Sequence, residues 1–181
     1  MASKPRAKAG SAKSSLAVYA GSFDPVTYGH VDLIERASRL FESVIVAIGT
    51  HPTKNPTFSV EERVELLTHV TAPYPNVTVD KFSGLLIQFC AERGARVVVR
   101  GLRVLTDFEY ELQIAHANAD LEPTIDTIFL PTRTKHGFVS ASLVREIASH
   151  GGDVRRYAPK VVCDALALKF APAPKRKTKK A

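Results

Sequence analysis

The chain has 181 residues, of which 45% are apolar and 24% charged, and its formal net charge is +7. These proportions are typical of a soluble globular protein, and the length favours a single domain with a well-buried core. No apolar run approaches the roughly 20 residues of a membrane span, and residues 1–15 lack the apolar stretch of a secretory signal. We therefore expect a cytoplasmic protein with no membrane partner.

The positive charge is concentrated at the two ends of the chain. Residues 1–15 contain four basic residues and residues 171–181 contain five, and neither segment contains an acidic residue. The net charge of residues 16–170 is therefore −2. Both ends are rich in Ala, Lys, Ser and Pro, so we expect two disordered basic tails around one folded domain over 16–170. Weak binding of polyanions and a merely solubilising role are both open for the tails.

Strand-like and helix-like segments alternate through the domain. Apolar periodicity predicts five strands, at Leu16–Ala20, Ser43–Ile48, Val77–Phe82, Arg96–Val99 and Thr127–Leu130. The helices predicted between the strands are Val31–Phe41, a helix opened by a capping box at Ser59 and running through Ala72, Leu85–Arg93, and a helix opened by a capping box at Thr106 and ending near Leu121. Two more helices are predicted after the last strand, at Ser142–Ser149 and Pro159–Phe170. This alternation implies an α/β fold, a doubly wound five-stranded parallel sheet of Rossmann-like type with helices on both faces.

The expected place for chemistry in such a fold is the set of loops that follow the strands. Ligands bind beyond the carboxyl ends of the strands, near the point where the strand order reverses. The loops after the first, second, fourth and fifth strands are 21–30, 49–57, 100–106 and 131–141. The unusual residues of the chain lie in or beside these loops.

The loop after the first strand reads GSFDPVTYGH over residues 21–30. Gly21 lets a ligand approach the backbone closely, and Ser22 offers a hydroxyl and an N–H at a strand end. His30 stands at the start of a helix, where free N–H groups and the helix dipole favour a phosphate. Its imidazole could then donate hydrogen bonds to a phosphoryl oxygen. The alternative is that His30 only caps the helix or packs in the core.

The fourth strand is followed by two arginines, Arg100 and Arg103, with Gly101 between them. A guanidinium keeps its charge at neutral pH and presents several donors in a fixed plane, so two of them at a strand end form a natural clamp for polyphosphate. The alternative is a structural network in which both arginines pair with Glu109 or Glu111.

The other two loops contain a lysine and a group of small hydroxyl residues. Lys54 lies in the Pro-bounded segment HPTKNP over residues 51–56, where an ordinary solvated side chain is the alternative to a phosphate ligand. The segment KHGFVSAS over residues 135–142 opens a helix. Small hydroxyl residues there cap the helix and leave N–H groups for an anion, although simple capping is also open.

These motifs carry a resemblance to a known family. GSFDP followed by TxGH over residues 21–30 resembles the nucleotidylyltransferase superfamily, whose usual signature is HxGH, with Thr27 in place of the first His. The TxGH form and the block RGLR…DFEYE over residues 100–111 are similar to the bacterial phosphopantetheine adenylyltransferase family. The resemblance covers about residues 17–168. It departs at Ala20, where Pro is frequent, at Ala141, where Ser or Gly is frequent, and at His136, where the family often has an aromatic side chain.

The resemblance implies a reaction. The family reversibly transfers the adenylyl group of ATP to 4′-phosphopantetheine, giving dephospho-coenzyme A (dephospho-CoA) and pyrophosphate in coenzyme A (CoA) biosynthesis. The chain shows no nucleophile set beside a base and an orienting group, so direct in-line transfer at the α-phosphate is the simpler mechanism. Two alternatives are open: a related transferase that uses CTP or nicotinate mononucleotide, and a non-catalytic protein that binds nucleotide or nucleic acid.

The resemblance also implies the roles of individual residues. His30 would stabilise the pentavalent α-phosphate, and Lys54 and Arg103 would assist catalysis. The phosphopantetheine ligands would be Ser22, Lys54, Leu86 and Arg100. The ATP ligands would be Ser22, Phe23, His30, Gly101, Leu102, Arg103, Glu111, His136, Gly137, Phe138, Val139, Ser140, Ala141 and Ser142.

The family further implies the cofactor and the partners. Mg²⁺ is expected to bind mainly through the phosphates of ATP, because it prefers oxygen ligands and keeps several waters. We expect no metal site built by the protein itself, and two cysteines alone cannot form a four-ligand zinc site. The resemblance implies a homohexamer and inhibition by CoA.

Overall fold

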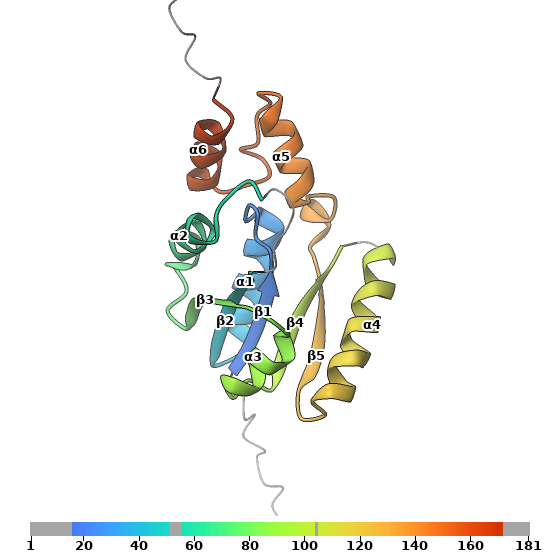
Figure 1. Cartoon of the computed structure of the whole chain (residues 1–181). Helices are drawn as coiled ribbons and strands as arrows, with labels where there is room; N and C mark the ends of the chain where they lie inside the picture. The colour runs from blue at the N-terminus through green and yellow to red at the C-terminus, as the bar shows by residue number, and fades with distance from the viewer. Residues whose placement is uncertain (1–15, 51–55, 104, 172–181) are drawn as a thin grey trace, which may run out of the picture.

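Five strands lie side by side in one parallel sheet (Figure 1). The computed structural model describes residues 16–50, 56–103 and 105–171. The strands are β1 (Leu16–Gly21), β2 (Ser43–Gly49), β3 (Val77–Phe82), β4 (Val97–Leu102) and β5 (Asp126–Pro131). Their order across the sheet is β3-β2-β1-β4-β5, and every neighbouring pair is parallel. The predicted fold class is confirmed.

The predicted helices are all present between the strands or after the last one. They are α1 (Tyr28–Leu40), α2 (Val60–Thr71), α3 (Leu86–Glu92), α4 (Leu105–Leu121), α5 (Ala141–Ser149) and α6 (Lys160–Lys169). A short 3₁₀ turn, η1 (Thr134–His136), precedes α5 and was not predicted. No helix in the described residues is both long and apolar enough to span a membrane.

Side chains of the central strand alternate between two cores, one on each face of the sheet. Ala17 and Tyr19 belong to the larger core, together with buried residues of α1, α2, α5 and α6. Val18 and Ala20 belong to the smaller core, together with buried residues of α3. The ring of Phe108 on α4 meets Phe129 of β5 at a centroid distance of 5.8 Å. Because β1 is covered on both faces, its sequence is an uninterrupted run of apolar residues and does not alternate between apolar and polar.

Most predicted element bounds differ from the structure by one residue, and three differences bear on the motifs. Helix α1 begins at Tyr28 rather than Val31, because its first turn is polar and lacks the apolar period. Strand β4 continues through Leu102, which pairs with Pro131, so the first part of the arginine motif lies in a strand and not in a loop. Helix α4 begins at Leu105, so Thr106 lies inside the helix and does not precede it.

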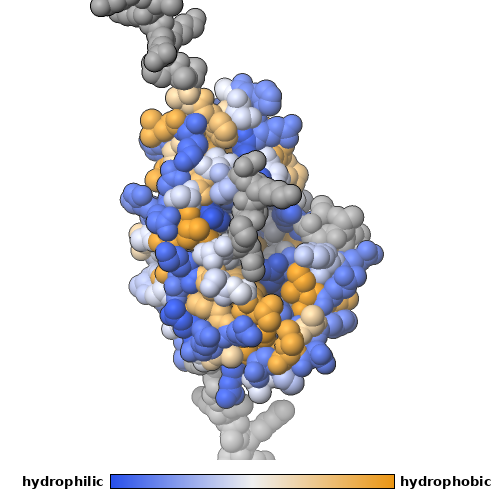
Figure 2. Space-filling view, in the orientation of Figure 1, coloured by the Kyte–Doolittle hydropathy of each residue, from blue (hydrophilic) through white to orange (hydrophobic). Residues whose placement is uncertain are grey.

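The described surface is mostly polar, with a few exposed apolar side chains. Figure 2 shows apolar residues gathered in the lower part of the view, where Figure 1 places α3 and α4. Leu85, before α3, is 50% exposed, and Leu121 at the end of α4 is 59% exposed. Tyr110 on α4 is 65% exposed and Ile128 on β5 is 38% exposed. This side of the molecule is therefore a candidate contact surface.

Candidate functional site

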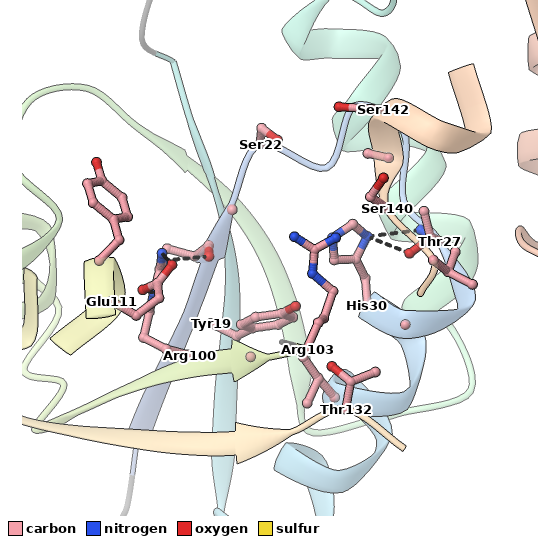
Figure 3. Close-up of a pocket in the computed structure, with 18 residues that line it drawn as sticks. Tyr19, Ser22, Thr27, His30, Arg100, Arg103, Glu111, Thr132, Ser140 and Ser142 are labelled. Carbon is pink, nitrogen blue, oxygen red and sulfur yellow. Dashed lines mark hydrogen bonds and ion pairs between the residues drawn. The ribbon is translucent and has the colours of Figure 1, made fainter. Parts of the chain in front are cut away.

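A cavity of about 390 Å³ opens where β1 and β4 end and where α1 and α5 begin (Figure 3). Strand order reverses between β1 and β4, because β2 and β3 lie on one side of β1 while β4 and β5 lie on the other. This is the position at which doubly wound sheets bind ligands. The residues that line the cavity are Tyr19, Ala20, Gly21, Ser22, Thr27, Gly29, His30, Leu33, Arg100, Gly101, Arg103, Tyr110, Glu111, Thr132, Val139, Ser140, Ala141 and Ser142.

His30 is fixed in one tautomer. The N–H of Thr27 donates to Nδ1 of His30 at 2.9 Å, so Nδ1 is an acceptor and a neutral ring carries its proton on Nε2. Burial, and to a smaller extent the charge of Arg103, lower the pKa of His30 from 6.5 to about 4. At neutral pH the cavity therefore contains an uncharged imidazole with one ring N–H available. His30 caps α1 and lines the cavity at the same time, so the two roles considered for it are compatible.

Tyr19 and Arg103 lie beside His30 in the cavity (Figure 3). Burial raises the pKa of the Tyr19 hydroxyl well above its usual value of 10, although the charges of Arg100 and Arg103 act in the opposite direction. Tyr19 is therefore neutral at physiological pH. Arg103, which stands just after β4, has an exposed side chain that borders the cavity. Its permanent charge supplies positive potential at this point.

Arg100 is held by a carboxylate. Its Nε and Nη2 donate to the two carboxylate oxygens of Glu111, each at 2.5 Å, and its Nη1 donates to the carbonyl oxygen of Ala20 at 3.1 Å. Glu111 lies on α4, so this bidentate pair joins α4 to the ends of β4 and β1. The structural network considered as an alternative is thus present for Arg100 with Glu111. Both side chains nevertheless line the cavity.

The start of α5 forms another wall of the cavity. The hydroxyl of Ser140 accepts the N–H of Leu143 at 3.0 Å, which confirms that a serine caps this helix. Ser142 accepts a hydrogen bond at 3.2 Å from Arg145, so its own hydroxyl proton can point elsewhere. Gly29 and His30 near the start of α1, and Ala141 and Ser142 at the start of α5, border the same space. The N–H of Tyr28, the first residue of α1, donates to the carbonyl oxygen of Tyr157 at 2.9 Å. Two helix N-termini at one cavity favour a ligand with several negative charges.

Several predicted ligands do not line this cavity. Phe23 is 1% exposed, and its ring packs edge-on against Tyr19 and His30. Leu86 packs against the smaller core. The remaining predicted residues absent from the lining are Leu102, His136, Gly137 and Phe138. Lys54 lies outside the described residues.

The sequence did not single out several residues that line the cavity. Tyr19 belongs to an apolar strand pattern that predicts only core, and neither Leu33 nor Thr132 belongs to a motif that the sequence offered. Tyr110 lies in the block DFEYE, but no role was assigned to it. Their place in the fold was the available signal, because β1 and β5 end at this edge of the sheet. Within the described part of the chain, no group of three or more His, Cys, Asp or Glu side chains could hold a metal ion.

Comparison with known proteins identifies relatives over most of the chain. A family model described as cytidylyltransferase-like matches residues 18–147. A phosphopantetheine adenylyltransferase of Synechococcus sp. (strain RCC307) is 54% identical over 154 residues, which cover 85% of this chain and 93% of that protein. A phosphopantetheine adenylyltransferase of Caldanaerobacter subterraneus subsp. tengcongensis is 49% identical over 155 residues, which cover 86% of this chain and 97% of that protein.

Solved structures share the fold at low sequence identity. A putative nicotinate-nucleotide adenylyltransferase from Vibrio parahaemolyticus has a TM-score of 0.64 and 17% identity, covering 87% of this chain and 96% of its own. A Plasmodium falciparum nicotinic acid mononucleotide adenylyltransferase, complexed with NaAD, has a TM-score of 0.61 and 13% identity, covering 86% and 95%. At these identities the likeness shows the fold alone.

Proposed function

This chain belongs to the phosphopantetheine adenylyltransferase family, and on that premise we propose that it transfers the adenylyl group of ATP to 4′-phosphopantetheine. The products are dephospho-CoA and pyrophosphate, and the reaction is a step of CoA biosynthesis. The observation that carries the proposal is the cavity with its neutral His30, its arginines and its two helix N-termini. These features suit a reaction in which two phosphate-bearing substrates meet.

The central difficulty of this reaction is the repulsion between two anions. Two unit charges 4 Å apart repel by roughly 4 kcal/mol at an effective dielectric constant of 20. Arg103 and the positive ends of the α1 and α5 helix dipoles offset this repulsion at one point. Because these groups are fixed in place before the substrates arrive, they also supply orientation.

We propose a direct in-line transfer. A phosphate oxygen of phosphopantetheine attacks the α-phosphorus of ATP, and the bond from that phosphorus to the bridging oxygen breaks, so that pyrophosphate leaves with the electron pair. His30 donates its Nε2–H to an α-phosphate oxygen as charge develops there, and Arg103 stabilises the same charge. Because the ring is already neutral, its remaining Nε2 proton is very weakly acidic, so His30 acts as a hydrogen-bond donor and not as a general acid.

Substrate contacts are assigned through the family resemblance. Ser22 and Arg100 would bind the phosphate of phosphopantetheine, with Lys54 and Leu86 as further ligands. Residues 101–103 and 136–142, together with Glu111, would hold ATP. Mg²⁺ would arrive as the Mg·ATP complex, because the triphosphate offers the oxygen ligands that this ion prefers.

The family resemblance also supports proposals about assembly and regulation. We propose a homohexamer in the cytoplasm, inhibited by CoA. The exposed apolar side chains of Leu85, of α4 and of β5 offer a surface for self-association. Light scattering of the purified chain tests the assembly, and inhibition of the forward reaction by added CoA tests the regulation.

The proposed function is tested by following pyrophosphate release. Purified protein is mixed with Mg·ATP and 4′-phosphopantetheine, with each substrate omitted in turn and with Mg·CTP in place of Mg·ATP. We expect release only when ATP and phosphopantetheine are both present. Release with CTP at an equal rate, or none from a folded sample that binds ATP, would contradict the proposal.

A further inference from the structure

The proposed mechanism gives no role to Arg63, whose guanidinium is buried beside the site. Arg63 lies near the start of α2 and is 3% exposed. Its Nη1 donates to the carbonyl oxygen of Ser22 at 2.9 Å, and its Nε donates to the carbonyl oxygen of Ser59 at 3.3 Å. Among the described residues, no carboxylate lies within ion-pair distance of Arg63. A buried charge without a counter-charge opposes folding, so its place beside Ser22 calls for an explanation.

The hydrogen bond from Arg63 fixes the peptide between Ser22 and Phe23. This peptide is trans, since the only cis bond in the described residues is Asp24–Pro25. The C=O and N–H of a trans peptide point in opposite directions, so the N–H of Phe23 points away from Arg63. Within the described chain, this N–H donates to no protein acceptor. It directly follows Ser22, which lines the cavity, whereas Phe23 itself is 1% exposed and is absent from the lining.

The backbone of Phe23 needs such support. Its φ is +47°, in the left-handed region that residues with a Cβ rarely adopt. On one side its ring is packed against Tyr19 and His30, with centroid distances of 5.4 and 5.1 Å. On the other side the buried carboxylate of Asp24 accepts two backbone N–H groups, from Thr57 and Phe58, each at 2.9 Å. Arg63 fixes the peptide that enters this strained residue.

We propose that Arg63 is a positioning residue for adenylyl transfer, an inference that rests on the proposed function. Its guanidinium holds the Ser22–Phe23 peptide in the orientation that presents Ser22 to substrate phosphate, and it places a buried positive charge behind Ser22. Arg63 itself does not contact substrate. The planar guanidinium bridges carbonyl groups of two elements, the β1–α1 loop and the residue that caps α2. A lysine ammonium lacks this fixed pair of donors.

The test compares Arg63→Ala with a matched variant of the same helix. Leu67 is fully buried on α2 and has no place in the site, so Leu67→Ala controls for general destabilisation. For each variant, the melting temperature, the kcat and the KM for ATP are measured on the full chain. Arg63→Ala is also assayed with guanidinium ion far below denaturing concentrations, against sodium chloride at the same concentration. Arg63→Lys serves as a second variant that keeps the charge.

We expect Arg63→Ala to lower kcat by roughly 10- to 100-fold, the effect of a small misplacement of reacting groups. Leu67→Ala should keep kcat within roughly 3-fold of the wild type despite a similar loss of melting temperature. Guanidinium should restore part of the activity of Arg63→Ala and none to Leu67→Ala, and Arg63→Lys should have an intermediate kcat.

Two outcomes would overturn the inference while leaving the proposed function intact. One is an Arg63→Ala enzyme with the kcat of Leu67→Ala and no response to guanidinium. The other, decisive if Arg63→Ala does not fold, is a folded Arg63→Lys enzyme with wild-type kcat. Failure of the proposed function has a different signature, since the wild-type chain itself would then form no dephospho-CoA.

Discussion

At the scale of single residues, the site depends on which ring nitrogen of His30 carries the proton. The Thr27 N–H occupies Nδ1, which leaves the Nε2–H for a ligand. A donor of this kind acts only where negative charge grows, so its effect falls on the transition state more than on the bound substrate. The low pKa of His30 keeps the ring neutral, and repulsion from Arg103 contributes to that state.

We predict that His30→Ala lowers kcat by roughly 100-fold or more, as loss of a transition-state donor does. The dissociation constant for ATP should change little. Calorimetric titration with ATP and steady-state kinetics check the two quantities separately. His69→Ala, on the exposed side of α2, is the matched control and should behave as the wild type. A folded His30→Ala enzyme with normal kcat would exclude the role assigned to His30.

The same residue predicts a pH dependence of stability. The pKa of His30 is about 4 in the folded chain and 6.5 in its ordinary state, so the unfolded chain binds the proton more readily between these values. The free energy of unfolding therefore falls as the pH drops from neutral toward 4, by up to about 3 kcal/mol from this group. His30→Gln removes this contribution. Urea unfolding of both proteins at about pH 7 and about pH 4.5 measures it, and equal pH slopes would refute it.

At the scale of elements, the caps of two helices give a matched pair of variants. Ser59 caps α2 through a reciprocal capping box with Glu62, and Ser140 caps α5 at the cavity. Each Ser→Ala change should lower the free energy of unfolding by about 1 kcal/mol. Ser140→Ala should also raise the KM for ATP by roughly 5-fold, whereas Ser59→Ala should not. Thermal melts and ATP kinetics check the pair, and equal KM values would argue against a phosphate role for α5.

The sequence predicted these elements well where apolar periodicity extends to their ends. Strand β3 has the predicted bounds, Val77–Phe82, and the capping box at Ser59 is present. The first turn of α1 was missed because its polar residues carry chemistry instead of packing. The end of β4 was missed because Gly101 suggests a loop, although its lack of a Cβ serves packing. A Cβ at that position would lie 2.3 Å from Cδ1 of Leu33.

The contacts between elements were the part that the sequence could not supply. Arg63 sits in an amphipathic helix, where an arginine is normally solvated, and only the fold brings it under Ser22. The apolar pattern of the first strand predicts that Tyr19 is buried, but it does not indicate that a cavity lies at the end of that strand. The bidentate pair of Arg100 with Glu111 was one of two open alternatives, and spacing alone did not decide between them.

At the scale of the whole molecule, the positive charge of the chain is concentrated in residues 1–15 and 171–181. Among the described residues, those that line the cavity lie between 19 and 142, and the two tails together carry nine basic residues. We predict that a chain reduced to residues 16–170 keeps the kcat of the full chain. The full chain should bind DNA weakly at low salt, and this binding should fall steeply as salt rises. Equal DNA binding by the two chains at low salt would show that the tails do not carry it.

The identity of the acceptor substrate is the property that most directly distinguishes this chain from proteins that share only its fold. Wild-type protein is incubated with Mg·ATP and either 4′-phosphopantetheine or nicotinate mononucleotide, and the products are identified by mass. The account predicts dephospho-CoA from the first mixture and no dinucleotide from the second. If the protein formed a dinucleotide from nicotinate mononucleotide and formed no dephospho-CoA, the account would be contradicted. The acceptor specificity would then match that of the structural neighbours and not that of the sequence family.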